Sequence, residues 1–201
     1  MPLLDDGPLD GGPGIPPGSP LVGVILSFPD RVAEELRTWR ESFGDRMAES
    51  IPAHITLVTT TETKDWDATT EHVRSVAAAT SPFRVSLRGT GTFRPVSPVV
   101  FVNVAEGFDE CVRLHRRLQR GPLERVLPFP YHPHVTVAHD LPPEQLDAAQ
   151  NALKSYRESF TVASMGLYEH DADGFWQLRE ELDFGTRRDT PREGKQQQPH
   201  R

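Results

Sequence analysis

Two short segments of the chain each place a histidine and a threonine two residues apart. The first reads Pro-Ala-His-Ile-Thr-Leu-Val and contains His54 and Thr56. The second reads His-Pro-His-Val-Thr-Val-Ala and contains His134 and Thr136. Their branched and apolar composition favours strands, and residues i and i+2 of a strand point to the same face. Each segment therefore predicts an imidazole beside a hydroxyl, and two such pairs facing each other across a cleft would bind a phosphate group.

Two imidazoles and two hydroxyls are suited to cleaving a phosphate ester. The reaction needs one group to remove a proton from the attacking oxygen and another to deliver a proton to the leaving oxygen. The ordinary pKa of histidine is about 6.5, so one imidazole can be neutral while the other is charged near neutral pH. Threonine hydroxyls can donate to the phosphate oxygens on which negative charge develops. Either histidine could be the base, because substrate orientation decides that choice.

The elements expected around the two segments occur twice in the same order. Hydrophobic periodicity predicts strand, helix, His-Thr strand, helix and strand over 21–88. The same order recurs over 99–168, where residues 160–168 are expected to form one strand, and a closing strand follows over 175–184. Residues 59–64, directly after the first His-Thr strand, are expected to be a polar loop. The repeat is one of organisation, without residue identity beyond the motif.

This order predicts one folded domain between two tails. Residues 1–19 and 185–201 are crowded with proline, glycine and polar residues, which is typical of disordered segments. The domain is expected over 20–184, with two lobes of about 20–92 and 93–184 between which strands can be exchanged. Each lobe would contribute one histidine and one threonine to a shared cleft.

Charge argues against a protein that coats nucleic acid. The 201 residues carry a formal net charge of −7, with a pI of about 5.6. The middle of the chain is nevertheless basic, since eight arginines and four acidic residues lie between Arg84 and Arg125. This stretch would either guide an anionic ligand or form a solvated helix face.

The single cysteine, Cys111, rules out a disulfide within the chain and indicates a reducing compartment. The first residues lack the basic start and apolar stretch of a signal peptide. No apolar run approaches the roughly 18 residues that a membrane helix needs. We therefore expect a cytoplasmic protein that does not associate with membranes.

The two segments resemble the paired His-x-Thr-x (HxTx) motifs of the two-histidine (2H) phosphoesterase superfamily, in particular its 2′-5′ RNA ligase-like branch. The resemblance covers about residues 20–184. It implies an α+β fold that is bilobal, with two antiparallel sheets and flanking helices around a central cleft. It also implies RNA-processing chemistry: hydrolysis of 2′,3′-cyclic phosphates or 2′-5′ phosphodiesters of a nucleotide or RNA end, with no metal or other cofactor.

The same resemblance implies roles for the motif residues. His54 and His134 would be the catalytic acid–base pair, while the hydroxyls of Thr56 and Thr136 would bind phosphate oxygens. The branch often has an arginine directly after the second motif, where this chain has His139. A guanidinium clamp on the phosphate would therefore come from the basic middle or be missing. No DNA partner is expected, and the protein is expected to be a monomer.

Three alternatives stay open from the residues alone. His132, His134 and His139 could be metal ligands, although Pro133 interrupts the first two and no cysteine or acidic residue follows at zinc spacing. Tyr131 could contact the substrate by stacking on a base, or could pack in the core, and His139 could border the cleft. Finally, the cleft could bind a nucleotide or RNA end without turning it over.

Overall fold

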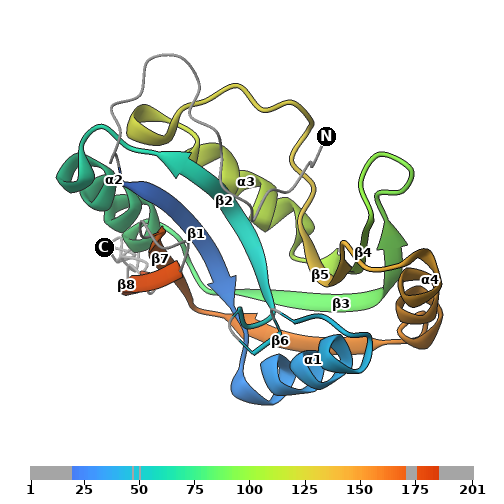
Figure 1. Ribbon diagram of the computed structural model, residues 1–201. Helices are drawn as coiled ribbons and strands as arrows, with labels where there is room; N and C mark the ends of the chain where they lie inside the picture. Colours follow the sequence, from blue (N-terminus) through green and yellow to red (C-terminus); the bar gives the residue numbers. More distant parts are fainter. Residues whose placement is uncertain (1–19, 47, 50, 171–175, 186–201) are drawn as a thin grey trace, which may run out of the picture.

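The chain folds into an α+β structure of two curved sheets with helices packed around them (Figure 1). The computed structural model describes residues 20–46, 48–49, 51–170 and 176–185. The expected tails, 1–19 and 185–201, lie outside these residues apart from Gly185. The elements are β1 (Leu21–Ser27), α1 (Asp30–Ser42), β2 (His54–Glu62), α2 (Trp66–Ala78), β3 (Phe83–Thr92), β4 (Val99–Glu106), α3 (Phe108–Leu118), the 3-10 turn η1 (Gly121–Leu123), β5 (His134–His139), α4 (Pro143–Ala152), β6 (Arg157–Val162), β7 (Ser164–His170) and β8 (Trp176–Asp183).

Both sheets are antiparallel and have four strands. The first sheet has the order β2-β1-β7-β8, and the second has the order β5-β4-β3-β6. The predicted α+β class with two antiparallel sheets is therefore confirmed. Each His-Thr strand lies at the edge of its sheet, next to the strand that begins its half of the chain. β3 of the first half belongs to the second sheet, while β7 and β8 of the second half belong to the first.

Alternation along the strands sends apolar side chains into the core. Ile55 and Leu57 of β2 and Val135 and Val137 of β5 are buried, so the histidine and threonine between them face the other way. Helix α3 packs against β2, and α2 packs against β7 and β8. Helix α4 contacts β3, β4 and β5 of the second sheet. The helices thus cover the apolar faces of the strands.

Local signals set the ends of the helices that lead to and follow β2. The Asp65 carboxylate accepts a hydrogen bond from the Ala68 backbone N–H and caps the start of α2. Helix α1 ends at Ser42 with Phe43 as its C-cap, and Gly44 follows with a φ of 90°, a conformation that glycine adopts without strain. This reversal returns the chain toward His54.

Two expected element boundaries are wrong. The single strand expected over 160–168 is two strands, β6 and β7, which belong to different sheets. The buried positions change from Phe160 and Val162 to Met165 and Leu167, which shifts the alternation by one residue at Ala163. The expected loop over 59–64 continues β2 as far as Glu62, because threonines favour strands and this stretch pairs with β1.

No helix in the described part of the chain has the length and apolar character needed to cross a membrane.

Candidate active site

The two His-Thr segments meet at one cleft. His54 is the first residue of β2 and His134 is the first residue of β5, and the two strands contact each other. These histidines line a cleft of about 890 Å³ together with Thr56 and Thr136. The volume lies within the usual range for small-molecule sites. The structure therefore brings together the four residues that the sequence pattern singled out.

Each motif histidine is held through Nδ1 by a carbonyl two residues earlier. The Nδ1 of His54 lies 2.8 Å from the Pro52 oxygen, and the Nδ1 of His134 lies 2.7 Å from the His132 oxygen. A carbonyl can only accept, so Nδ1 carries the proton and donates it in both rings. In the neutral ring Nε2 is then the basic nitrogen, and in the charged ring it is a donor. Both histidines can therefore exchange a proton with a ligand through Nε2.

Aromatic rings enclose His134. The ring of Phe93 meets it edge-on with centroids 5.0 Å apart, and the ring of Phe101 lies at 5.2 Å. The pKa of His134 is lowered to about 4, mainly by burial and in smaller part by neighbouring His132 and His54, while the hydrogen bond to the His132 carbonyl acts in the opposite direction. His134 is therefore neutral at pH 7.

Arginines reach the cleft from a segment that sequence reasoning did not consider. Arg40, near the end of α1, and Arg46, in the connection to β2, both line the cleft. Arg40 is only 6% exposed, and its Nε donates to Asp45 Oδ2 at 2.8 Å while its Nη1 donates to the Ile51 carbonyl. It thus fixes the connection that leads into His54. On a helix rich in charged residues, nothing in the sequence distinguished this arginine from a solvated one.

Of the two alternatives left open for a phosphate clamp, a clamp from the basic middle does not fit this cleft, because none of the eight arginines of that stretch lines it. Their partners lie elsewhere: Arg94 pairs with Asp147 at 2.8 Å, and Arg84 pairs with Glu106 at 3.3 Å. Arg125 donates to the Thr60 carbonyl at 2.9 Å. These three arginines form ion pairs and hydrogen bonds within the folded domain, away from the cleft.

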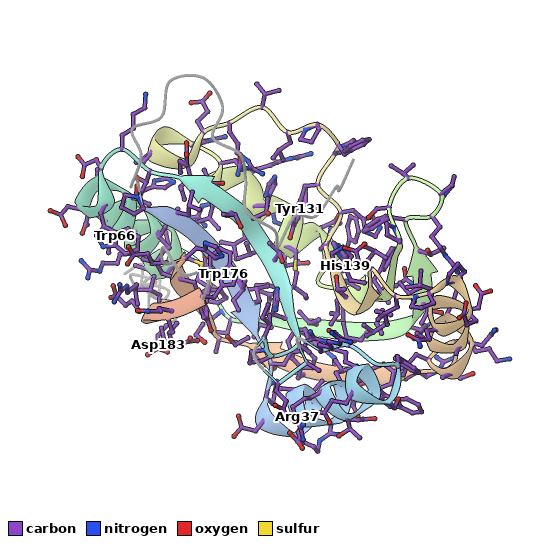
Figure 2. The ribbon with its side chains drawn as sticks, viewed as in Figure 1. Arg37, Trp66, Tyr131, His139, Trp176 and Asp183 are labelled. Atoms are coloured by element: carbon purple, nitrogen blue, oxygen red, sulfur yellow. The ribbon has the colours of Figure 1, made fainter. Side chains whose placement is uncertain are left out.

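His139 and Tyr131, the two candidates for further substrate contacts, occupy different places (Figure 2). His139 lines the cleft, and its Nε2 lies 3.3 Å from Asp140 Oδ2. Tyr131 is not part of the cleft lining. Its hydroxyl donates to the Thr56 carbonyl at 2.8 Å, and its ring stacks on His115 at 3.9 Å. The placement of Tyr131 therefore corresponds to the core-packing alternative, in which it positions the Thr56 backbone.

The cleft also includes aromatic residues that the sequence analysis assigned to strands without a functional role. Tyr168 of β7 and Trp176 of β8 line it beside Gly23 of β1. In sequence they are indistinguishable from the apolar members of a buried strand.

Among the described residues, no group of three or more histidine, cysteine or acidic side chains is placed to hold a metal ion. Cys111 is buried, and this burial raises the pKa of its thiol to about 12, so the sulfur is an unreactive part of the core.

Comparison with known proteins agrees with this geometry. The profile of the 2′-5′ RNA ligase superfamily matches residues 28–174, a range that contains both His-Thr segments. The chain belongs to this superfamily. The 2′-5′ RNA ligase superfamily is one of two-histidine phosphoesterases, so the resemblance found in the motifs is confirmed.

Curated relatives of this superfamily member are similar over nearly their whole length. A protein of Bacillus pumilus named "Putative phosphoesterase" is 29% identical over 168 residues, which cover 81% of this chain and 96% of the relative. A similarly named protein of Geobacillus kaustophilus is 27% identical over 167 residues, covering 81% of this chain and 95% of the relative.

Solved structures share the fold of this superfamily member. Escherichia coli LigT, crystallised with 3′-AMP, superposes with a TM-score of 0.61 at 17% identity, over 84% of this chain and 100% of LigT. A Thermus thermophilus protein superposes with a TM-score of 0.59 at 20% identity, over 83% of this chain and 99% of the other.

Proposed function

We propose that the protein is a metal-independent phosphoesterase that hydrolyses a 2′,3′-cyclic phosphate or a 2′-5′ phosphodiester of a nucleotide or RNA end. The observation that carries this proposal is the matched pair of histidines, each held through Nδ1 by a backbone carbonyl and each followed by a threonine on the same strand face. This arrangement supplies two proton-exchanging nitrogens and two hydroxyl donors to one phosphate.

The surroundings of His134 support an assignment of the two roles. His134 is neutral at pH 7 and can take a proton from the attacking water through Nε2. His54, in its charged form, then gives a proton from Nε2 to the ribose oxygen that leaves phosphorus. The new P–O bond forms as the ester bond breaks. Thr56 and Thr136 donate to the phosphate oxygens, and Arg46 adds positive charge to the same cleft, whereas the charge of Arg40 is paired with that of Asp45.

This chemistry and one structural relative support the proposed substrate class. A 2′,3′-cyclic phosphate or 2′-5′ linkage needs a ribose 2′-oxygen, so RNA-type rather than DNA-type ligands are proposed. The complex of E. coli LigT with 3′-AMP supports a nucleotide ligand for this fold. The lone buried Cys111 supports a reducing, cytoplasmic setting.

Phosphorus NMR of a 2′,3′-cyclic nucleotide incubated with the protein in chelator tests the reaction. We expect conversion to one monophosphate, 2′ or 3′, and a loss of about 10²- to 10⁴-fold in turnover for His54→Ala and for His134→Ala. His72→Ala is the matched control, since His72 lies on α2 outside the cleft and contacts the Leu118 carbonyl. Circular dichroism verifies that each variant is folded.

Near wild-type turnover in either motif variant would contradict the two-histidine mechanism. Nucleotide binding without any product would instead indicate a binding module that uses the same cleft.

A further inference from the structure

Trp176 contributes an indole ring to the cleft that the acid–base chemistry does not use. It is the first residue of β8, is partly exposed and lines the cleft beside Tyr168 and Gly23. Figure 2 shows it beside β1. A large aromatic side chain left partly open in a cleft is available to a ligand.

Gly23 allows the indole to lie directly on β1. A Cβ atom at Gly23 would come within 2.6 Å of Trp176 Cζ3 and 2.7 Å of Cη2, closer than real contacts allow. Glycine weakens a strand interior and often marks a close approach of another group to the backbone. β1 therefore has no side chain at the position where the six-membered ring of the indole lies against it.

Two neighbouring rings contact the indole. The His170 ring lies 5.0 Å from it at an interplanar angle of 66°, and the Tyr168 ring lies 6.5 Å away at 78°. These contacts restrain the indole ring. A restrained aromatic ring loses little conformational entropy when a flat group stacks on it.

The register of β1 sets the distance between this ring and the reacting phosphate. Ile25 pairs with Thr56 of β2, and Gly23 precedes Ile25 by two residues along β1, whose register with β7 is regular over these positions. Two strand residues span about 7 Å. The indole over Gly23 is thus displaced along the cleft from the level of Thr56 by a length that one ribose can bridge.

We propose that Trp176 stacks on the nucleobase of the substrate whose phosphate lies between His54 and His134. This inference rests on the proposed function and narrows it: the preferred substrate is a nucleotide or RNA end, not a simple alkyl phosphate ester. Stacking uses the π-face that every base has, so Trp176 selects for a base without choosing strongly among the four.

Kinetics with two substrates test the role of Trp176. The first is 2′,3′-cyclic CMP, and the second is glycerol 1,2-cyclic phosphate, which has the same five-membered cyclic ester but no base. We expect Trp176→Leu to raise KM for the nucleotide about tenfold, with kcat little changed. KM for the glycerol ester should stay as in the wild type.

Gly23→Ala is a second, independent variant, because its Cβ would displace the far end of the indole while leaving Trp176 in the chain. It should reproduce the rise in KM for the nucleotide. Trp66→Leu is the matched control: Trp66 packs against the core from α2 and does not line the cleft, so neither substrate should be affected. Circular dichroism compares the folds.

Equal effects of Trp176→Leu on both substrates, or no effect on the nucleotide, would overturn the stacking role. If the wild type turns over neither substrate, the proposed function fails, and binding decides the inference by itself. Titration with 3′-AMP should then quench the tryptophan fluorescence of the wild type, whereas Trp176→Leu should bind at least about fivefold more weakly. Equal affinity in the two proteins would overturn the proposal.

Discussion

The same kind of backbone contact holds both motif histidines, and His134 is in addition enclosed by aromatic rings. The Nδ1–H of His134 donates a hydrogen bond to the His132 carbonyl, and the Nδ1–H of His54 donates one to the Pro52 carbonyl. Phe93 and Phe101 then replace much of the water around His134. Aromatic rings stabilise a charged imidazole less than water does, so the neutral form is favoured. His134 therefore remains a base at pH values where an exposed histidine would be protonated.

We expect the acidic limb of the kcat/KM profile to lie near pH 4, because the pKa of His134 is lowered to about 4, mainly by burial. Below this pH the ring gains a proton and can no longer accept one from water, so the rate falls. Phe93→Ala opens the enclosure to water, raises the pKa of His134 and moves the limb to higher pH. The pH dependence of kcat/KM and NMR titration of the imidazole signals measure the shift.

Phe108→Ala is the control for this prediction. Phe108 contacts the His132 ring at 5.6 Å, so its removal should leave the acidic limb in place. A limb that does not move in Phe93→Ala would show that the aromatic enclosure does not control the protonation of His134.

Strand β2 is held by side-chain hydrogen bonds as well as by its pairing with β1. An edge strand presents backbone groups that need partners. Here side chains provide several: Tyr131 donates to the Thr56 carbonyl, His115 Nδ1 to the Leu57 carbonyl at 2.7 Å, and Arg125 to the Thr60 carbonyl. These contacts fix the strand that presents half of the site.

Tyr131→Phe should destabilise the protein by about 1–2 kcal/mol, because the Thr56 carbonyl loses a buried donor while the ring packing is kept. Urea denaturation measures the change in the free energy of unfolding. Tyr156→Phe is the matched variant and should cost less, since its hydroxyl reaches Glu35 Oε2 only at 3.5 Å. A Tyr131→Phe protein as stable as the wild type would show that the hydroxyl contributes nothing to holding β2.

The two lobes of the whole molecule are not two halves of the chain. β3 leaves the first half to join the second sheet, and β7 and β8 return from the second half to the first sheet. Each sheet therefore needs both halves to be complete. The cleft between the His-Thr strands consequently depends on the folding of the entire domain.

We expect a fragment of residues 20–92 to be unfolded by itself, because β1 and β2 would lack β7 and β8, and β3 would lack both of its neighbours. Amide NMR dispersion measures this, with a protein of residues 20–185 as the folded control. Adding a fragment of residues 93–185 should restore dispersion. A dispersed spectrum and cooperative unfolding of the first fragment alone would contradict this dependence.

Sequence patterns predicted the positions of the helices and strands better than they predicted which strands pair with each other. The alternation in β2 and β5 was sufficient to place His54 beside Thr56 and His134 beside Thr136. The break between β6 and β7 was missed because its signal, a one-residue change in alternation at Ala163, is small beside the continuous apolar pattern. Arg40 was missed because its position on a helix rich in charged residues does not reveal that the connection after the helix folds back over it.

The sequence by itself determined the local chemistry: a strand alternates its side chains through backbone geometry, so spacing alone sets each imidazole beside a hydroxyl. Only the tertiary structure decided that both strands are edge strands facing one cleft, that Phe93 and Phe101 enclose His134, and that Trp176 lies on Gly23. The physical reason is that desolvation and apposition depend on contacts between residues far apart in the chain, and no local pattern encodes those contacts.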